Sequence, residues 1–426
     1  MSAGDRVLTA DWVVPVSSPP VAEGALAVVD GRVAWVGRSD QVPPQWRELP
    51  VEELRGVLTP GLVNAHAHLQ YTAFAELGQG TYSGFEEWAE AFEEIYISIH
   101  DRDYWRHSAL AGARLAVESG TTSIGDVVTD ISALGAQHSE GMTGIDYLEV
   151  LGQTDRTWAE GERETFLAHL DGLDPQRFGI SPHAPYSVDA GVITDLVDIA
   201  AERGMRLHSH VGESAAEEAL YEDGTPRVLD VYGDLRDEFA LVRDGGAGMA
   251  TVPYASSIGL LGASTHIAHA IYIDRPGRDL LRSCGTAVAL CPRSNAIIGV
   301  GPAPVADYLR EGHEISVGTD SLASSPSLDL MADVAELARI AYDQGYREPD
   351  LGTRLVRAAT LGGAKALGLQ RGVIEAGAPA DLTLFDVTVE GEAVEQALVE
   401  RAAGTCVRTV CGGSVLHPSA APPTRG

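Results

Sequence analysis

Two histidines separated by one residue, His66 and His68, end an apolar segment that opens at Pro60-Gly61. Side chains alternate along a β-strand, so residues two apart point the same way. A buried strand with this pair at its end presents two imidazoles on one side, which is half of a metal site. A pair of surface histidines is the simpler interpretation, but the apolar run before the motif favours the buried strand.

A third imidazole and a carboxylate follow later apolar segments in the same way. His210 ends the segment that starts at Leu207, and Asp320 follows Gly318-Thr319. Three imidazoles and one carboxylate, contributed by His66, His68, His210 and Asp320, would bind a divalent ion and leave one position open for water. Such an ion makes water a nucleophile near neutral pH. We therefore expect one ion per chain, with Zn²⁺ as the first choice and Fe²⁺ as the second.

Proton carriers are predicted beside these ligands. Glu213 lies three residues after His210 and can lean back over the same pocket as an acid or base. His208 lies on the same side of its strand as His210, and the position of Glu213 favours His210 as the ligand. His269 ends another apolar segment, where it either handles the proton of the water together with Asp320 or is a structural histidine. We predict Glu213, His269 and Asp320 as the catalytic residues.

His183 lies between Pro182 and Pro185, which restrict the backbone on both sides. A rigidly placed imidazole suits a hydrogen bond to the substrate better than metal binding, so we predict His183 as a substrate-binding residue. Tyr186 could contact the substrate or only pack in the core.

The segments that must hold these residues alternate short apolar strands with longer helices, which is typical of parallel α/β folds. Eight strand candidates are predicted, starting near Val57, Thr122, Thr143, Phe178, Met205, Thr265, Ala287 and Glu314. This pattern predicts a (β/α)₈ barrel over residues 58–371, with its active site at the carboxyl ends of the strands. Short strands with turn signals at both chain ends predict one composite β-sandwich domain from residues 1–57 and 372–426.

Composition narrows the choice of partners. The 426 residues carry a formal charge of −31, which disfavours nucleic acids and anionic membranes as partners. No long uncharged apolar run is present, and the four cysteines form no CxxC pair. We expect a cytoplasmic homodimer that acts on a small molecule.

The sequence lacks the residues that several other kinds of enzyme chemistry require. The one lysine, Lys365, lies beyond the eighth strand, so neither a carboxylated lysine bridging two metals nor a Schiff base is expected. The H-x-E and P-C-x-x-C signature of cytidine-type deaminases is absent, as are glycine-rich phosphate loops. A catalytically inactive scaffold would be expected to have lost ligands, whereas every predicted ligand is present here.

In this order, the motifs resemble the amidohydrolase superfamily, in its deaminase and chlorohydrolase branch. The resemblance runs from Pro60 through His66-Ala67-His68, His210-x-x-Glu213 and Ala268-His269 to Gly318-Thr319-Asp320 and the late helical segment ending at Gly368. It implies a mononuclear metal on His66, His68, His210 and Asp320. It also implies hydrolytic deamination of a 6-aminopurine nucleoside, with proton transfer by Glu213 and His269.

Two further segments, Cys291-Pro292-Arg293-Ser294-Asn295 and His68-Leu69-Gln70-Tyr71-Thr72, are most similar to aminofutalosine deaminases of menaquinone biosynthesis. That substrate carries a carboxylate, for which Arg293 is our candidate partner. The resemblance also suggests a glutamate that binds the ribose, for which we chose Glu94. Adenosine, S-adenosylhomocysteine and methylthioadenosine remain alternative substrates, as does a triazine that loses chloride.

Overall fold

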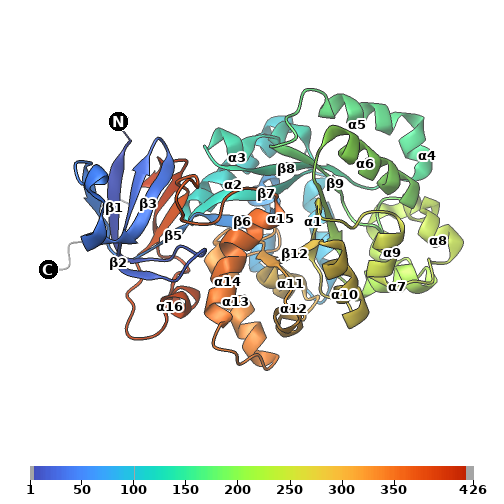
Figure 1. Ribbon diagram of the computed structural model, residues 1–426. Helices are drawn as coiled ribbons and strands as arrows, with labels where there is room; N and C mark the ends of the chain where they lie inside the picture. The colour runs from blue at the N-terminus through green and yellow to red at the C-terminus, as the bar shows by residue number, and fades with distance from the viewer. Residues whose placement is uncertain (1–3, 100, 419–426) are drawn as a thin grey trace.

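The computed structural model describes residues 4–99 and 101–418, and most of them belong to a parallel barrel (Figure 1). The eight strands of its sheet lie in chain order. Across the remaining seam, the backbone N–H of Asp320 donates to the carbonyl of His66 at 3.0 Å, so the first and last strands lie side by side. The predicted (β/α)₈ barrel is confirmed. Its strands are β6 (Leu62–Ala67), β7 (Thr121–Val128), β8 (Thr143–Val150), β9 (Phe178–Pro182), β10 (Leu207–Val211), β11 (Thr265–His269), β12 (Ala287–Leu290) and β13 (Ile315–Val317).

Helices cover the outside of the barrel, and several of them pack an apolar face against it. In α6 the buried residues recur at helical spacing, from Val192 and Ile193 to Leu196 and Ile199, and Gly204 ends the helix in the left-handed conformation. No helix within the described ranges is both long and apolar enough to cross a membrane. The helices are α1 (Phe85–Tyr96), α2 (Arg102–Glu118), α3 (Ala136–Ser139), α4 (Asp155–Thr157), α5 (Arg163–Leu170), α6 (Ala190–Arg203), α7 (Ala215–Asp223), α8 (Ala240–Asp244), α9 (Thr251–Ser257), α10 (Arg275–Cys284), α11 (Pro292–Ile298), α12 (Val305–Glu311), α13 (Leu330–Asp343), α14 (Leu351–Arg357), α15 (Gly363–Ala366) and α16 (Val394–Arg401).

The two chain ends build a separate sheet, which Figure 1 shows as blue and red strands side by side at one end of the molecule. Its first hairpin turns at Asp30 and Gly31, both at positive φ (49° and 73°), as expected for an Asp-Gly turn. The late strand β14 pairs antiparallel with β5, which joins the two ends of the chain. The strands are β1 (Arg6–Val13), β2 (Val21–Val29), β3 (Arg32–Arg38), β4 (Val51–Glu53), β5 (Val57–Pro60), β14 (Leu382–Phe385), β15 (Cys406–Cys411) and β16 (Ser414–Pro418).

The segment predicted as one strand from Val57 to the His-x-His motif is two strands divided at Gly61. The first part, β5, belongs to the chain-end sheet, and the second, β6, begins the barrel. A side chain at Gly61 would come within 2.3 Å of Thr122, so glycine lets the chain pass between the sheets here. The boundaries 58 and 371 stay predictions, and the outermost residues of that β domain, 1–3 and 419–426, lie outside the described residues.

Candidate active site

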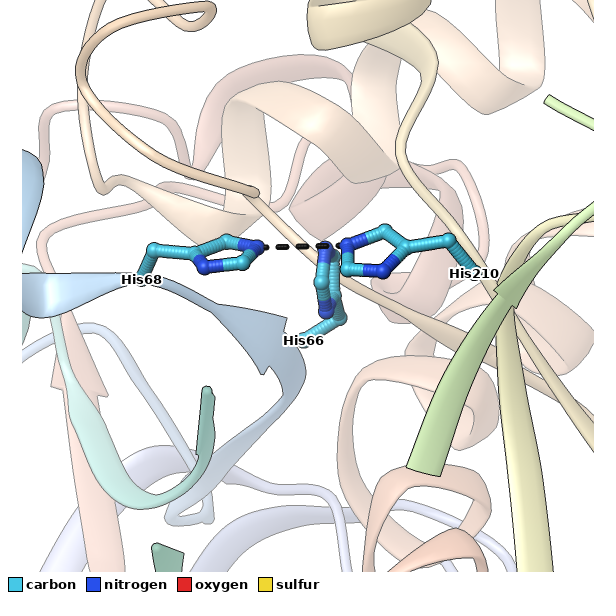
Figure 2. Close-up of side chains that lie close together, drawn as sticks. All are labelled: His66, His68 and His210. Atoms are coloured by element: carbon cyan, nitrogen blue, oxygen red, sulfur yellow. Dashed lines mark hydrogen bonds between the residues drawn. The ribbon is translucent and has the colours of Figure 1, made fainter. Parts of the chain in front are cut away.

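Three imidazoles converge at the carboxyl end of the barrel (Figure 2). His66 lies on β6 and His68 directly after it, while His210 comes from β10. The Nε2 atoms of His68 and His210 are 3.3 Å apart. Asp320, which follows β13, places Oδ1 3.6 Å from Nε2 of His66 and 3.7 Å from Nε2 of His68. Four potential ligands from three strand ends therefore surround one point.

The protonation of this cluster suits a cation. His66 is fully buried, and neither of its ring nitrogens has a hydrogen-bond partner among the described residues. Burial lowers the pKa of His66, and it lowers the pKa of His68 to about 3. Burial alone would raise the pKa of Asp320, but the neighbouring His66 and His269 hold it well below its usual range. Neutral imidazoles around an ionised carboxylate are the donors that a divalent transition metal takes.

The backbone holds two of these side chains in unusual conformations. Asp320 has φ 60° and His269 has φ 70°, both in the left-handed region that side chains other than glycine rarely adopt. Strained residues of this kind gather where function requires a fixed direction. The sequence does not signal them, because both follow strands that are otherwise regular.

Glu213 and His269 lie together beside the ligand cluster. Oε1 of Glu213 is 3.5 Å from Nε2 of His269, which is 3.9 Å from Oδ2 of Asp320. Burial, with the charge of Asp320, raises the pKa of Glu213 well above its usual range, which favours the protonated form of this carboxyl. Glu217 accepts the backbone N–H groups of Gly212 and Glu213 at 2.9 and 2.8 Å and fixes this turn. The cluster thus places a carboxyl of raised pKa beside an imidazole, two groups that can exchange protons with a ligand in the cavity.

A cavity of about 360 Å³ opens above the cluster. His183 and Tyr186 line it, as do the predicted ligands His68, His210 and Asp320. Helix α1 and the helical segment η7 (Arg227–Glu238) supply much of its outer wall. Aromatic rings dominate the wall: Tyr71, Phe85, Trp88, Phe92, Tyr96, Tyr186 and Tyr232. A flat apolar ligand of nucleoside size fits such a lining.

Two predicted substrate-binding residues lie outside this cavity. The guanidinium of Arg293 donates to Oδ2 of buried Asp333 at 2.7 Å and to the carbonyl of Ser327 at 2.8 Å. Those bonds turn Arg293 toward α13, so it is not available to a substrate carboxylate. Glu94 is exposed, whereas the preceding Glu93 lines the cavity. Neither Arg293 nor Glu94 is therefore among the residues that line the cavity, and their predicted roles stay predictions.

The sequence did not point to three further residues that hold or extend the site. Ser294 donates to Oδ2 of Asp320 at 2.7 Å, and the amide oxygen of Asn295 lies 3.0 Å from Nδ1 of His269. Both sit at the start of α11, in the segment already singled out for Arg293. Glu149, at the end of β8, lines the cavity, and burial raises its pKa to about 7. A strand-end position was the available signal for Glu149.

Comparison with known proteins agrees with this geometry. Residues 57–416 match the model of the amidohydrolase family. A relative from Haloarcula marismortui, named 5-methylthioadenosine/S-adenosylhomocysteine deaminase, is 31% identical over 380 residues, which are 85% of this chain and 81% of that protein.

Two solved structures share the fold. An adenosine deaminase from Xanthomonas campestris with bound zinc has a TM-score of 0.81 at 22% identity and covers 97% of this chain and 93% of its own. Aminofutalosine deaminase from Helicobacter pylori, in complex with methylthio-coformycin, has a TM-score of 0.81 at 21% identity and covers 96% and 99%. Family match, sequence identity and fold agree over most of the length, and the chain belongs to the amidohydrolase family, in its deaminase branch.

Proposed function

We propose that this protein catalyses the hydrolytic deamination of a 6-aminopurine nucleoside. The observation that carries the proposal is the position of Glu213, 3.5 Å from His269, where both line a nucleoside-sized cavity above the ligand cluster and burial raises the pKa of Glu213. An acid is needed there because the purine ring nitrogen must gain a proton as water adds to the neighbouring carbon. The name of the Haloarcula relative, a deaminase of adenosine derivatives, supports the same reaction.

We propose His66, His68, His210 and Asp320 as the ligands of one divalent ion, with Zn²⁺ first and Fe²⁺ second. Their unpartnered or mutually facing nitrogens fit such an ion. A divalent ion bound there would make water a nucleophile at neutral pH. Two ions would need a bridging group such as a carboxylated lysine. The one lysine, Lys365, pairs with Glu314 at 2.6 Å instead, which is consistent with the proposal of a single ion.

In the proposed reaction, water adds to the ring carbon that carries the amino group. Glu213 gives its proton to the adjacent ring nitrogen, and His269 with Asp320 takes a proton from the water. The carbon–nitrogen bond then breaks, and the amino group leaves as ammonia. The product therefore gains two protons, one on the ring nitrogen from Glu213 and one on ammonia. Water replaces both of them, and Glu213 ends the reaction protonated again. His183, held by Ser187 at 2.6 Å, is proposed to orient the purine.

The finer choice of substrate lies among adenosine derivatives. Aminofutalosine, and with it a place in menaquinone biosynthesis, is the prediction from the sequence motifs. It depends on a cation for the substrate carboxylate, and Arg293 is engaged elsewhere. An adenosine with a neutral 5′ substituent, such as methylthioadenosine, is favoured by the aromatic lining of the cavity. The name of the Haloarcula relative gives both methylthioadenosine and S-adenosylhomocysteine, so it supports an adenosine derivative without indicating the charge of its 5′ substituent.

Ammonia release from a panel of adenosine derivatives tests the proposal. We expect turnover by the wild type and a loss of about 10²-fold or more in kcat for Glu213→Gln, since a lost acid–base residue costs this much. Glu222→Gln, which changes an exposed glutamate on the neighbouring helix α7, serves as the control. Chloride release from a chlorinated triazine without ammonia release from any nucleoside would overturn the proposal in favour of a chlorohydrolase.

A further inference from the structure

Carboxyl side chains line the cavity, and neither lysine nor arginine is among its described lining residues. They belong to Glu93, Glu149, Glu213 and Asp320. Arg227, on the outer wall segment η7, pairs instead with Glu86 at 3.6 Å and its side chain is 71% exposed. Because the raised pKa of Glu213 favours its neutral form and Asp320 faces the proposed metal ligands, Glu93 and Glu149 supply the negative charge that the rest of a ligand would meet.

Among these carboxylates, Glu149 has no part in the proposed reaction, yet its position is fixed. One oxygen, Oε2, accepts a hydrogen bond from the hydroxyl of Thr129 at 2.6 Å. The hydroxyl of Tyr71 lies 2.8 Å from the same Thr129 oxygen and can donate to it, since the Thr129 proton is directed to Glu149. Gln70 accepts the backbone N–H of Thr129 at 2.9 Å, which holds this loop in place. A carboxylate held in this way is preorganised rather than freely mobile.

The other oxygen of Glu149 is free to bind a ligand. Oε1 is buried and has no hydrogen-bond partner among the described residues. A buried acceptor without a partner is costly, so a bound group that donates to it would be stabilised. Because Glu149 also lines the cavity, that group can belong to the substrate.

Glu149 lies between the histidines and the aromatic wall. Its carboxylate is within 4.8 Å of ring nitrogens of His183 and His210. A second metal ion at these three residues would have to share His210, whose Nδ1 bonds the carbonyl of His183 at 2.7 Å and whose Nε2 faces His68. One remaining nitrogen cannot serve two ions, so a second metal ion does not fit there, whereas a hydrogen-bond donor of a ligand in the cavity does.

We propose that Glu149 is a substrate-binding residue that selects nucleosides whose part beyond the purine is neutral or positively charged, and excludes those that carry an anion there. The proposal rests on the proposed deamination and specifies its substrate class. A neutral or cationic substrate can donate a hydrogen bond to Oε1 of Glu149.

An anionic substituent is excluded because the carboxylates that line the cavity carry the same sign of charge. An anionic substituent would lie near Glu149 and Glu93 with no cationic side chain to pair with, and like charges out of water repel strongly. A positive group would gain from the carboxylates and from the faces of Tyr96 and Tyr232, which also line the cavity. This selection disfavours aminofutalosine, which carries a carboxylate.

The test uses three adenosine derivatives that differ at the 5′ position. Adenosine-5′-carboxamide and adenosine-5′-carboxylate have the same shape but differ in charge, and 5′-amino-5′-deoxyadenosine carries a cation. At pH 8, above the pKa of about 7 that burial gives Glu149, we expect the wild-type kcat/KM for the carboxamide and for the amine to exceed that for the carboxylate by roughly tenfold or more. Glu149→Gln keeps the shape and the bond to Thr129, so the carboxamide-to-carboxylate ratio should move toward one. Glu149→Arg should invert it.

Ratios within one variant do not depend on how much of the protein is folded, which separates substrate selection from a structural role of Glu149. Glu90→Gln, an exposed change on α1, should leave the ratio unchanged. A wild type that prefers the carboxylate, or a Glu149→Gln ratio equal to that of the wild type, would overturn the proposal. If no nucleoside is deaminated, the proposed function fails, and calorimetric binding of the same three compounds to the metal-loaded protein still decides the charge selection.

Discussion

The ring Nδ1 of His210 lies 2.7 Å from the carbonyl oxygen of His183, and the backbone N–H of His210 donates to the same oxygen at 2.8 Å. A carbonyl can only accept, so Nδ1 of His210 carries the proton and Nε2 is left as the free electron pair toward His68. The tautomer of a proposed metal ligand is thus set by a proposed substrate-binding residue on the neighbouring strand. Changes in the strand end at His183 should therefore also affect the metal.

Removal of one imidazole should empty the metal site without unfolding the barrel. We expect His66→Ala to lower the metal content from about one equivalent per chain to near zero, because three of four ligands bind transition metals much more weakly. Circular dichroism should stay that of the wild type, and His169→Ala, an exposed change on α5, should keep its metal. Two equivalents of metal per wild-type chain, or full activity after chelation, would contradict the single site.

A hydroxyl behind the proposed ligand Asp320 should tune metal affinity. Ser294 donates to Oδ2 of Asp320 at 2.7 Å, and its loss leaves that oxygen less well oriented. We expect Ser294→Ala to weaken metal binding by about 10- to 100-fold, the usual effect of removing a group that orients a ligand. Competition with a chelator measures this affinity. Ser283→Ala, at an exposed position on α10, is the matched control, and an equal affinity in both variants would show that Ser294 does not act through the metal.

The strand ends that carry the site could be predicted from the sequence, because the alternation of side chains along a strand and the parallel order of the strands determine where these residues lie. Alternation along β6 puts His66 and His68 on one side, and the parallel order of the strands brings His210 and Asp320 to the same end of the barrel. These are local patterns combined with one topological rule. Glu149 follows the same rule, but a single acidic residue at a strand end has no partner in the sequence that would single it out.

The positions of Arg293 and Glu94 outside the cavity depend on information that a local pattern does not contain. Successive residues of an α-helix differ in direction by about 100°, so Glu93 and Glu94 could be distinguished only once the face of α1 toward the cavity was known. Arg293 is directed by Asp333, which is 40 positions later in the chain and on another helix. The contact with Asp333 forms only in the folded protein, and neither the spacing nor the charge of the residues near Arg293 in the sequence indicates it.

Arg293 should stabilise the fold rather than select a substrate. Its partner Asp333 is fully buried, so truncation would leave an unpaired buried carboxylate. We expect Arg293→Ala to lower the free energy of unfolding by about 3–5 kcal/mol, the typical cost of breaking a buried ion pair, and to leave the ratios between substrates unchanged. Urea unfolding measures the first effect. Arg339→Ala, which breaks a largely exposed pair on α13, should cost no more than about 1 kcal/mol. A changed preference between the carboxamide and carboxylate nucleosides would instead return Arg293 to the substrate.

Glu217 should make stability depend on pH. Burial raises the pKa of Glu217 from 4.5 to about 7, although the backbone N–H groups of Gly212 and Glu213 partly offset it. The folded protein therefore keeps this proton at pH values where the unfolded chain has lost it, and stability contributed by Glu217 is full below about pH 4.5 and declines as the pH rises through about 7. A rise of this size corresponds to about 3 kcal/mol.

Glutamine cannot lose that proton, so Glu217→Gln lacks this decline. We expect the wild type to lose stability relative to Glu217→Gln as the pH rises from 4.5 to 8, whatever the difference between them at the acidic end. Urea unfolding at a series of pH values measures the change, with Glu222→Gln, exposed on the same helix α7, as the control that should run parallel to the wild type. A constant difference between the wild type and Glu217→Gln would mean that Glu217 is already ionised in the folded protein, held so by the three hydrogen bonds it accepts from Gly212, Glu213 and Tyr221.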